Sequence, residues 1–190
     1  MGCKDIIKPL MGNKRFNHCI NVSKAAQILA KRFGEDENKA KIAGILHDIT
    51  KEFSYDEHIN MIKKFNIDVS NLEISTEKLL HSITGSAYVK NILNINDNDI
   101  LNSIRYHTTG RPGMSTLEKI IFVADFVSDE RDYQGVDEMR KLVDKGLDEA
   151  VFGGLCFTIE ALLKSKLPIH INTVLAYNEY VEKNKKGKNK

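Results

Sequence analysis

The sequence predicts an all-α fold, a single helical bundle, and three observations support this prediction. Apolar residues recur at three- and four-residue steps through most of the chain, which is the period of one face of a helix. No stretch of any length alternates apolar and polar residues at the period of a strand. The 190 residues, of which 42% are apolar and 28% charged, are enough to bury one core in a globular domain.

The first helices are expected to follow one another with short connections. A short amphipathic turn or helix covers Cys3 to Met11. The next helix runs from about Lys14 to Phe33, carries His18 on its apolar stripe, and ends at Gly34. Small residues such as Gly44 and Gly85 give two of the later helices thin faces that another helix can approach closely. These later helices are predicted at Glu35 to Asp48, Phe53 to Phe65, Leu79 to Leu93 and Asp97 to His107.

The second half continues this pattern after a loop at 108–113. Ser115, with Glu118 three residues later, is the signature of a capping box. Helices are predicted over Thr116 to Val127, Val136 to Val143, Leu147 to Lys164 and about Asn172 to Glu182. We therefore expect one domain over residues 1–181 and a lysine-rich flexible tail over 182–190.

The tail accounts for the basic balance of the chain. Residues 182–190 hold five lysines and one glutamate, a charge of +4, so the total of +2 leaves −2 for the other residues. This distribution indicates no nucleic-acid partner. No apolar run could span a bilayer and no signal segment opens the chain, which predicts no membrane partner and a cytoplasmic location. Three cysteines, without a CxxC pair, are expected to be reduced thiols.

Four histidines and two aspartates fall at inward faces or ends of the predicted helices: His18, His47, Asp48, His81, His107 and Asp125. Any one of them alone could be a core residue or a helix cap. Together, imidazoles and carboxylates without a thiolate suit iron, manganese, zinc or cobalt. Each helix offers one ligand or one adjacent pair, so several helices would hold the ion together. His58 lacks this pattern and is expected to be exposed.

Six segments carry a family resemblance and together span nearly the whole chain: Arg15 to His18, Ala43 to Lys51, His81 to Gly85, Ile104 to Pro112, Lys119 to Asp125 and Pro168 to His170. They resemble the HD superfamily of metal-dependent phosphohydrolases and, within it, the bacterial YqeK family, similar to symmetrical bis(5'-nucleosyl)-tetraphosphatases. The HTTGRPG and KIIFVAD segments are the most specific. One departure is that Val127 to Glu130 precede Arg131 where the family has Ile-Glu-Pro, so Asp129 or Glu130 would have to replace that glutamate.

The resemblance implies metal ligation by His18, His47, Asp48 and Asp125, with iron as the expected metal and manganese, cobalt or zinc as alternatives. A divalent ion lowers the pKa of a bound water and polarises a phosphoryl group. The candidate catalytic residues are Asp48, Lys51, His81 and His107. The candidate substrate contacts are Arg15, Lys51, His81, His107, Arg131 and His170. His81 and His107 could instead complete a second metal site bridged by Asp48; phosphate contact with a single metal is favoured.

The activity that the resemblance implies is symmetrical hydrolysis of diadenosine tetraphosphate, and of related dinucleoside polyphosphates, into two nucleoside diphosphates. Two alternatives stay open. One is an HD-type nucleotidase or phosphodiesterase acting on another nucleotide, and the other is an HD-fold sensor that binds a nucleotide without cleaving it. Amphipathic helices with an uncovered apolar face would also allow a homodimer.

Overall fold

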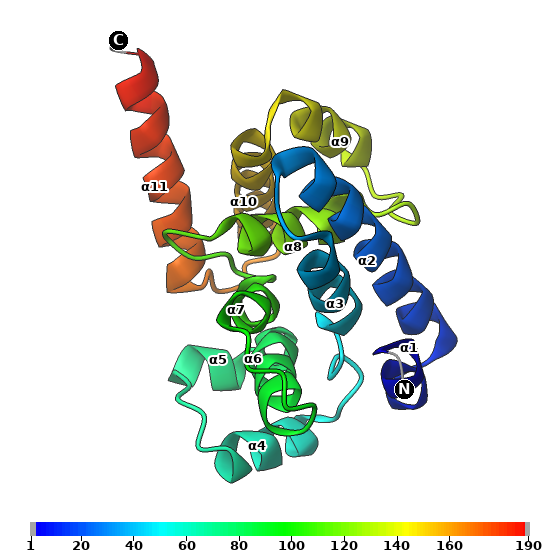
Figure 1. Cartoon of the computed structure of the whole chain (residues 1–190). Helices are drawn as coiled ribbons and strands as arrows, with labels where there is room; N and C mark the ends of the chain where they lie inside the picture. The colour runs from blue at the N-terminus through cyan, green and yellow to red at the C-terminus, as the bar shows by residue number, and fades with distance from the viewer. Residues whose placement is uncertain (1–2, 189–190) are drawn as a thin grey trace.

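The computed structural model describes residues 3–188, with side chains up to residue 185, and it confirms the all-α prediction (Figure 1). Within this range there are only helices, turns and loops. The elements are α1 (Cys3–Ile7), a 3-10 turn (Lys8–Leu10), α2 (Asn13–Phe33), α3 (Glu37–Leu46), α4 (Tyr55–Lys64), α5 (Asn71–Ser75), α6 (Glu77–Asn91), α7 (Asn98–Tyr106), α8 (Thr116–Val127), α9 (Val136–Lys145), α10 (Leu147–Lys164) and α11 (Ile171–Lys188).

The predicted boundaries hold where the sequence carries a local end signal. α8 and α10 match their predictions residue for residue, and α8 begins with the expected capping box of Ser115 and Glu118. α5 is an addition: no helix is predicted between Phe65 and Leu79, and Ser70 and Glu73 form a second capping box there. α11 continues to Lys188, beyond the expected end at Glu182. The flexibility of 182–190 stays a prediction, and residues 189 and 190 lie outside the described part.

α8 is the central helix of the bundle and packs against α2, α3, α7, α9 and α10 (Figure 1). Its side chains from Ile120 to Ala124 are almost fully buried, because the helix has neighbours on all sides. α10 crosses α8 closely at Gly154, where a Cβ atom would lie 2.7 Å from Phe122 Cε1. This packing holds Asp125, the next residue of α8, in the middle of the fold.

α2 and α3 form another close pair, as the small residues of α3 predict. A Cβ atom on Gly44 would lie 2.8 Å from Ser23 Cα, so only glycine allows this approach. Ser23 Oγ donates a hydrogen bond to the Lys41 carbonyl at 2.9 Å, which fixes the register of the pair. As a result the rings of His18 and His47 lie with their centroids 5.2 Å apart.

The expectation that His58 is exposed was wrong. His58 is buried in α4, where it shares one face with Ile62 four residues later. Its Nδ1 donates to Thr84 Oγ1 at 2.8 Å, and burial lowers the pKa of the imidazole below its ordinary value. His58 is therefore a neutral core residue that joins α4 to α6.

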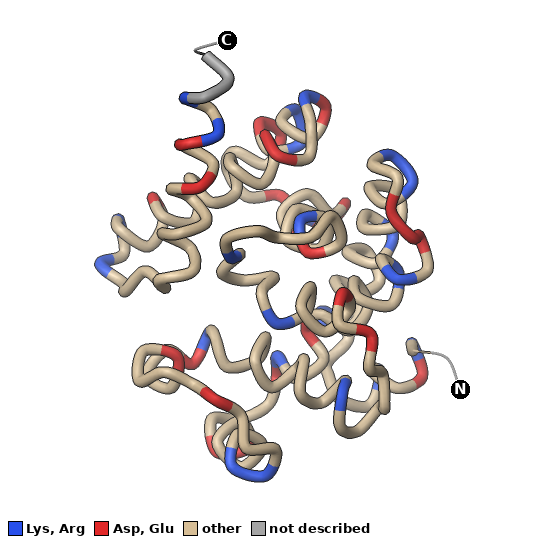
Figure 2. The backbone as a smooth tube through the Cα atoms, turned by 60° about the vertical axis from the view of Figure 1, so that its left-hand side comes forward, with Lys and Arg blue, Asp and Glu red and all other residues tan. Residues whose placement is uncertain are grey.

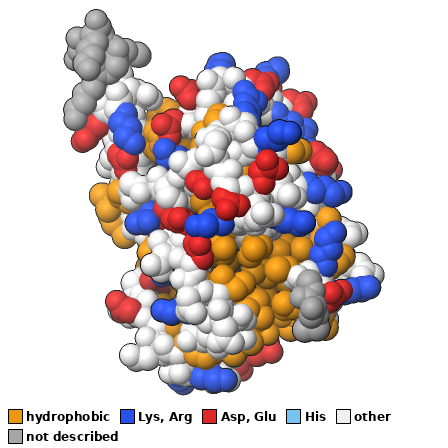
Figure 3. All heavy atoms as spheres, viewed as in Figure 1, with side chains coloured by type: hydrophobic (Ala, Val, Ile, Leu, Met, Phe, Trp, Pro, Cys, Tyr) orange, Lys and Arg blue, Asp and Glu red, His pale blue; other side chains and the backbone are white. Residues whose placement is uncertain are grey.

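The surface combines interspersed charges with a few exposed apolar side chains. Basic and acidic positions alternate over the outer turns of the backbone (Figure 2), and the space-filling view shows apolar side chains beside them (Figure 3). At the turn from α10 to α11 the exposed apolar residues are Leu163, Leu167, Ile171 and Leu175. None of the described helices is long and apolar enough to cross a membrane. The homodimer stays a prediction.

Candidate metal centre

The structure brings the six predicted histidines and aspartates together where α2, α3, α6, α7 and α8 meet. His18 comes from α2, His81 from α6 and Asp125 from α8, while the others directly follow helix ends: His47 and Asp48 after α3, His107 after α7. The four histidines and Asp48 are almost fully buried. The site is therefore assembled by five helices, each of which contributes one residue or one adjacent pair.

The four residues expected to bind metal form a tight cluster. His18 Nε2 lies 3.0 Å from Asp125 Oδ1 and 3.7 Å from Asp48 Oδ2. His47 Nε2 lies 3.4 Å from Asp48 Oδ2 and 3.9 Å from Asp125 Oδ1. Both imidazoles thus present Nε2 to both carboxylates.

Hydrogen bonds at Nδ1 fix which ring nitrogen of His47 and of His107 carries the proton. His47 Nδ1 donates to the Gly44 carbonyl at 2.7 Å, and His107 Nδ1 donates to the Ile104 carbonyl at 2.8 Å. These carbonyls are free because they lie in the last turns of α3 and α7. A neutral imidazole that donates from Nδ1 keeps a lone pair on Nε2, so His47 Nε2 is available to a metal, while His107 Nε2 lies 3.1 Å from His81 Nε2.

The cluster contains buried acceptors that the protein itself does not satisfy. Among the described side chains, the buried polar atoms without a hydrogen-bond partner include His18 Nε2, His47 Nε2 and Asp48 Oδ1. Leaving such atoms unpaired is costly, and a lone pair facing a carboxylate is repulsive unless a cation lies between them. The donor set and its unsatisfied atoms therefore fit a divalent metal ion.

The charge of the site also favours a cation. Without a cation, protons on the facing imidazoles take its place: burial raises the pKa of the Asp48 carboxyl, but contacts with the surrounding histidines outweigh this effect and hold the pKa well below its ordinary value. Burial likewise raises the pKa of Asp125, whereas contacts with His18, His47 and Arg131 lower it further than burial raises it. Both carboxylates are therefore ionised at neutral pH. Burial lowers the pKa of His81 to about 3, so this imidazole is neutral.

Two overlapping sets of three residues have ligand atoms within 4.8 Å of one another. One is His18, His47 and Asp125, and the other is His47, Asp48 and His107. His107 therefore shares a possible ligand set with His47 and Asp48. His81 belongs to neither set: its Nε2 lies 3.1 Å from both Asp48 Oδ1 and His107 Nε2.

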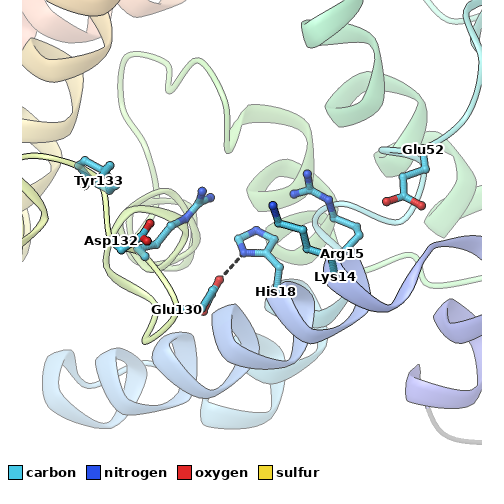
Figure 4. Close-up of a pocket in the computed structure, with 8 residues that line it drawn as sticks. Lys14, Arg15, His18, Glu52, Glu130, Asp132 and Tyr133 are labelled. Carbon is cyan, nitrogen blue, oxygen red and sulfur yellow. Dashed lines mark hydrogen bonds and ion pairs between the residues drawn. The ribbon is translucent and has the colours of Figure 1, made fainter.

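Basic side chains contact the cluster, and Figure 4 shows Lys14 and Arg15 beside His18. Arg15 Nη1 lies 2.6 Å from Asp48 Oδ2, and Arg131 donates to both the carboxylate and the carbonyl of Asp125. Lys51 Nζ lies 3.2 and 3.1 Å from the two ring nitrogens of His81. A cavity of about 280 Å³ opens beside the cluster, lined by Lys14, Arg15, His18, Glu52, Glu130, Arg131, Asp132 and Tyr133.

His170 is the predicted site residue that the structure places apart from this cluster. It is buried, with Nε2 3.5 Å from Glu73 Oε1, and its Nδ1 accepts from the backbone of Asn172. Glu73 also pairs with Arg105 at 2.7 Å. These contacts join α5, α7 and the start of α11. A contact of His170 with a nucleotide stays a prediction.

Five residues that line the cavity were not among the predicted contacts: Lys14, Glu52, Glu130, Asp132 and Tyr133. Lys14 lines the cavity, but one lysine beside Arg15 at the start of a helix cannot be told from a surface lysine by sequence. Glu130 had been considered only as a replacement for the family's glutamate, and its Oε1 lies 2.5 Å from His18 Nδ1. The two residues are 112 positions apart in the sequence, so no local sequence pattern could have predicted this contact.

Comparisons with known proteins agree with this arrangement. Residues 15–128 match the HD domain family. The chain is 38% identical over 174 residues to a protein of Halalkalibacterium halodurans named "Bis(5'-nucleosyl)-tetraphosphatase, symmetrical", covering 92% of each chain. It is also 38% identical over 172 residues to a Bacillus subtilis protein of the same name, covering 90% of this chain and 92% of that one.

A solved structure supports the fold. The crystal structure of a predicted HD superfamily hydrolase involved in NAD metabolism, from Clostridium acetobutylicum, superposes with a TM-score of 0.92 at 35% identity. The match covers 95% of this chain and 96% of that chain. The resemblance therefore extends over sequence, fold and the elements that carry the cluster.

Proposed function

The chain belongs to the HD domain family and, within it, to the YqeK family, and we propose that it hydrolyses diadenosine tetraphosphate symmetrically to two ADP. The observation that carries this proposal is the set of bare acceptors at the cluster, His18 Nε2, His47 Nε2 and Asp48 Oδ1. A protein that only bound a nucleotide would have no need for a buried, unsatisfied ligand set beside a cavity lined in part by basic residues. Relatives named as symmetrical tetraphosphatases supply the substrate class.

We assign His18, His47, Asp48 and Asp125 to the metal, with iron as the proposed ion and manganese, cobalt or zinc as alternatives. When bound, a divalent ion lowers the pKa of a coordinated water and polarises a phosphoryl oxygen. Asp48 faces both His47 and, through its other oxygen, His81, so it is the residue that would connect the metal to the substrate side. His107 has the position of a further ligand, and His81 that of a phosphate contact.

The basic residues have the geometry to hold a polyphosphate. Arg15 has one buried nitrogen, Nε, without a hydrogen-bond partner, in addition to the Nη1 atom that contacts Asp48. Lys51 contacts His81, whose ring in turn contacts His107. Phosphoryl transfer depends mainly on positioning and on stabilising negative charge, which the guanidinium group of Arg15 and the ammonium group of Lys51 can provide. Arg131 completes the set of basic residues from the loop after α8.

We further propose that the protein acts in the cytoplasm.

The direct test is product analysis on protein purified without chelator. We expect bound divalent metal by elemental analysis, and ADP as the product of diadenosine tetraphosphate. AMP together with ATP would contradict the symmetrical reaction. No turnover at full occupancy with iron, manganese or cobalt would indicate a nucleotide sensor. Faster turnover of a mononucleotide or cyclic nucleotide in a parallel panel would indicate the other hydrolase class.

Variants test the assignment of residues. Asp48→Asn keeps the shape of the side chain but removes its charge, and we expect it to lose metal and nearly all turnover. Lys51→Met should keep the metal but lower the turnover, since it removes only a charge that faces phosphate. Full activity of both His47→Ala and Asp48→Asn would contradict the whole proposal. Thermal unfolding of each metal-free variant shows whether it is folded.

A further inference from the structure

The rings of His18, His47 and His107 are each held by a hydrogen bond at Nδ1, but the acceptors are of two kinds. His47 and His107 directly follow helices, and each donates Nδ1–H to a carbonyl three residues earlier. His18 lies inside α2, where the carbonyls of the preceding turn already accept the hydrogen bonds of the helix. Its Nδ1 therefore needs an acceptor from elsewhere in the protein.

Glu130 supplies this acceptor. Its Oε1 lies 2.5 Å from His18 Nδ1 and also accepts from Ser128 Oγ at 2.9 Å (Figure 4). An ionised carboxylate is a stronger acceptor than a carbonyl. The pair thus fixes the His18 tautomer with Nε2 free.

The loop that carries Glu130 is itself held in place. The next residue, Arg131, donates to Asp125, a second residue of the cluster. Arg140 of α9 donates to the carbonyls of Ser128 at 3.3 Å and Arg131 at 3.1 Å. One loop therefore contacts His18 through an acid and Asp125 through a base, and α9 anchors this loop from outside the site.

We propose that Glu130 is a positioning residue that orients His18 for metal binding and raises the basicity of its ring. This inference rests on the proposed function, since it takes His18 to be a ligand. Hydrogen-bond partners behind a ligating histidine fix its tautomer and rotation, and their loss costs about 10–100-fold in metal affinity or activity. Glu130 has the position of such a partner, and it contacts the cluster through His18.

The test compares Glu130→Ala and Glu130→Gln with Asp129→Asn. Asp129 is the neighbouring acid and is exposed, so its variant controls for the loss of one negative charge from the loop. Mn²⁺ affinity is measured by competition with a coloured chelator. Nitrogen NMR of the histidine rings in metal-free protein reports the tautomer of His18 independently of turnover, and thermal unfolding of the same samples monitors the fold.

We expect Glu130→Ala to weaken Mn²⁺ binding about 10–100-fold and to lose the pure Nδ1–H tautomer of His18. Glu130→Gln should lie between, since its amide oxygen still accepts a hydrogen bond. Asp129→Asn should match the wild type. The positioning role is refuted if Glu130→Ala binds Mn²⁺ as tightly as Asp129→Asn and keeps the tautomer of His18. It is also refuted if the only change in Glu130→Ala is in the KM for the nucleotide substrate. The hydrolase proposal stands in both cases. If the wild type binds no metal, the proposed function itself fails.

Discussion

Replacing Gly44 by alanine tests whether the close contact of α2 and α3 builds the metal centre. The added Cβ would lie 2.8 Å from Ser23 Cα and 3.1 Å from its nitrogen. Both are backbone atoms, so the helices themselves must separate. Such overpacking costs about 1–3 kcal/mol, against a gain of roughly 1 kcal/mol from the higher helix propensity of alanine. The net change is a loss of up to about 2 kcal/mol in the free energy of unfolding.

Gly85 in α6 provides a matched control. Its added Cβ would lie 3.5 Å from Thr50 Oγ1 and 3.6 Å from two side-chain carbons, which is ordinary contact. Gly85→Ala should therefore keep the propensity gain of roughly 0.5–1 kcal/mol. The two substitutions are chemically identical and both lie within helices, yet we expect opposite signs.

Urea unfolding of the metal-free proteins measures both free energies. Gly44→Ala should also weaken metal binding, because the Gly44 carbonyl orients His47 and the helix that carries this carbonyl must move. Gly85→Ala should leave metal binding unchanged. Equal stabilisation by both substitutions would refute the inference that the spacing of α2 and α3 depends on glycine.

Three further predictions concern stability and the metal. Burial lowers the pKa of His58, so below the ordinary pKa of 6.5 the native state binds fewer protons than the unfolded state. The contribution of His58 to the free energy of unfolding is therefore complete above this pH and is lost as the pH falls below it. His58→Asn should make this fall shallower in urea unfolding between about pH 5 and 8. Ser115→Ala should cost about 1 kcal/mol, since it removes the cap of α8, and an unchanged unfolding midpoint would contradict this. A chelator should abolish turnover and lower the melting temperature without loss of helical circular dichroism, because the ion stabilises only the folded state.

The sequence predicts much of the fold because the helices carry their own start and end signals. Ser115 with Glu118 fixes the start of α8, and Gly34 ends α2. The cluster is also predictable, since each of its residues lies on an apolar stripe or at a helix end. Nothing in the sequence, however, measures how closely two helices approach.

The features that sequence reasoning missed depend on contacts between distant segments. The i, i+4 relation of His58 and Ile62 was available, but the burial of His58 depends on α6, which supplies Thr84. The sequence could not decide whether Asp129 or Glu130 replaces the glutamate of the family, because the answer depends on the path of a loop toward α2. α5 was missed because its capping box precedes only a single short turn of helix.

On the proposed function, the two arginine–aspartate pairs would link the binding of metal to the binding of substrate. Arg15 and Arg131 each contact a carboxylate of the cluster, so in this state part of their positive charge is already neutralised. If an ion took over Asp48 and Asp125, both guanidinium groups would be free to turn toward the cavity that they line, where they could meet phosphate. Linkage is reciprocal, so a polyphosphate would in turn tighten the hold on the ion. The arginines would then act as counterions that exchange a carboxylate for a phosphate as metal and substrate bind.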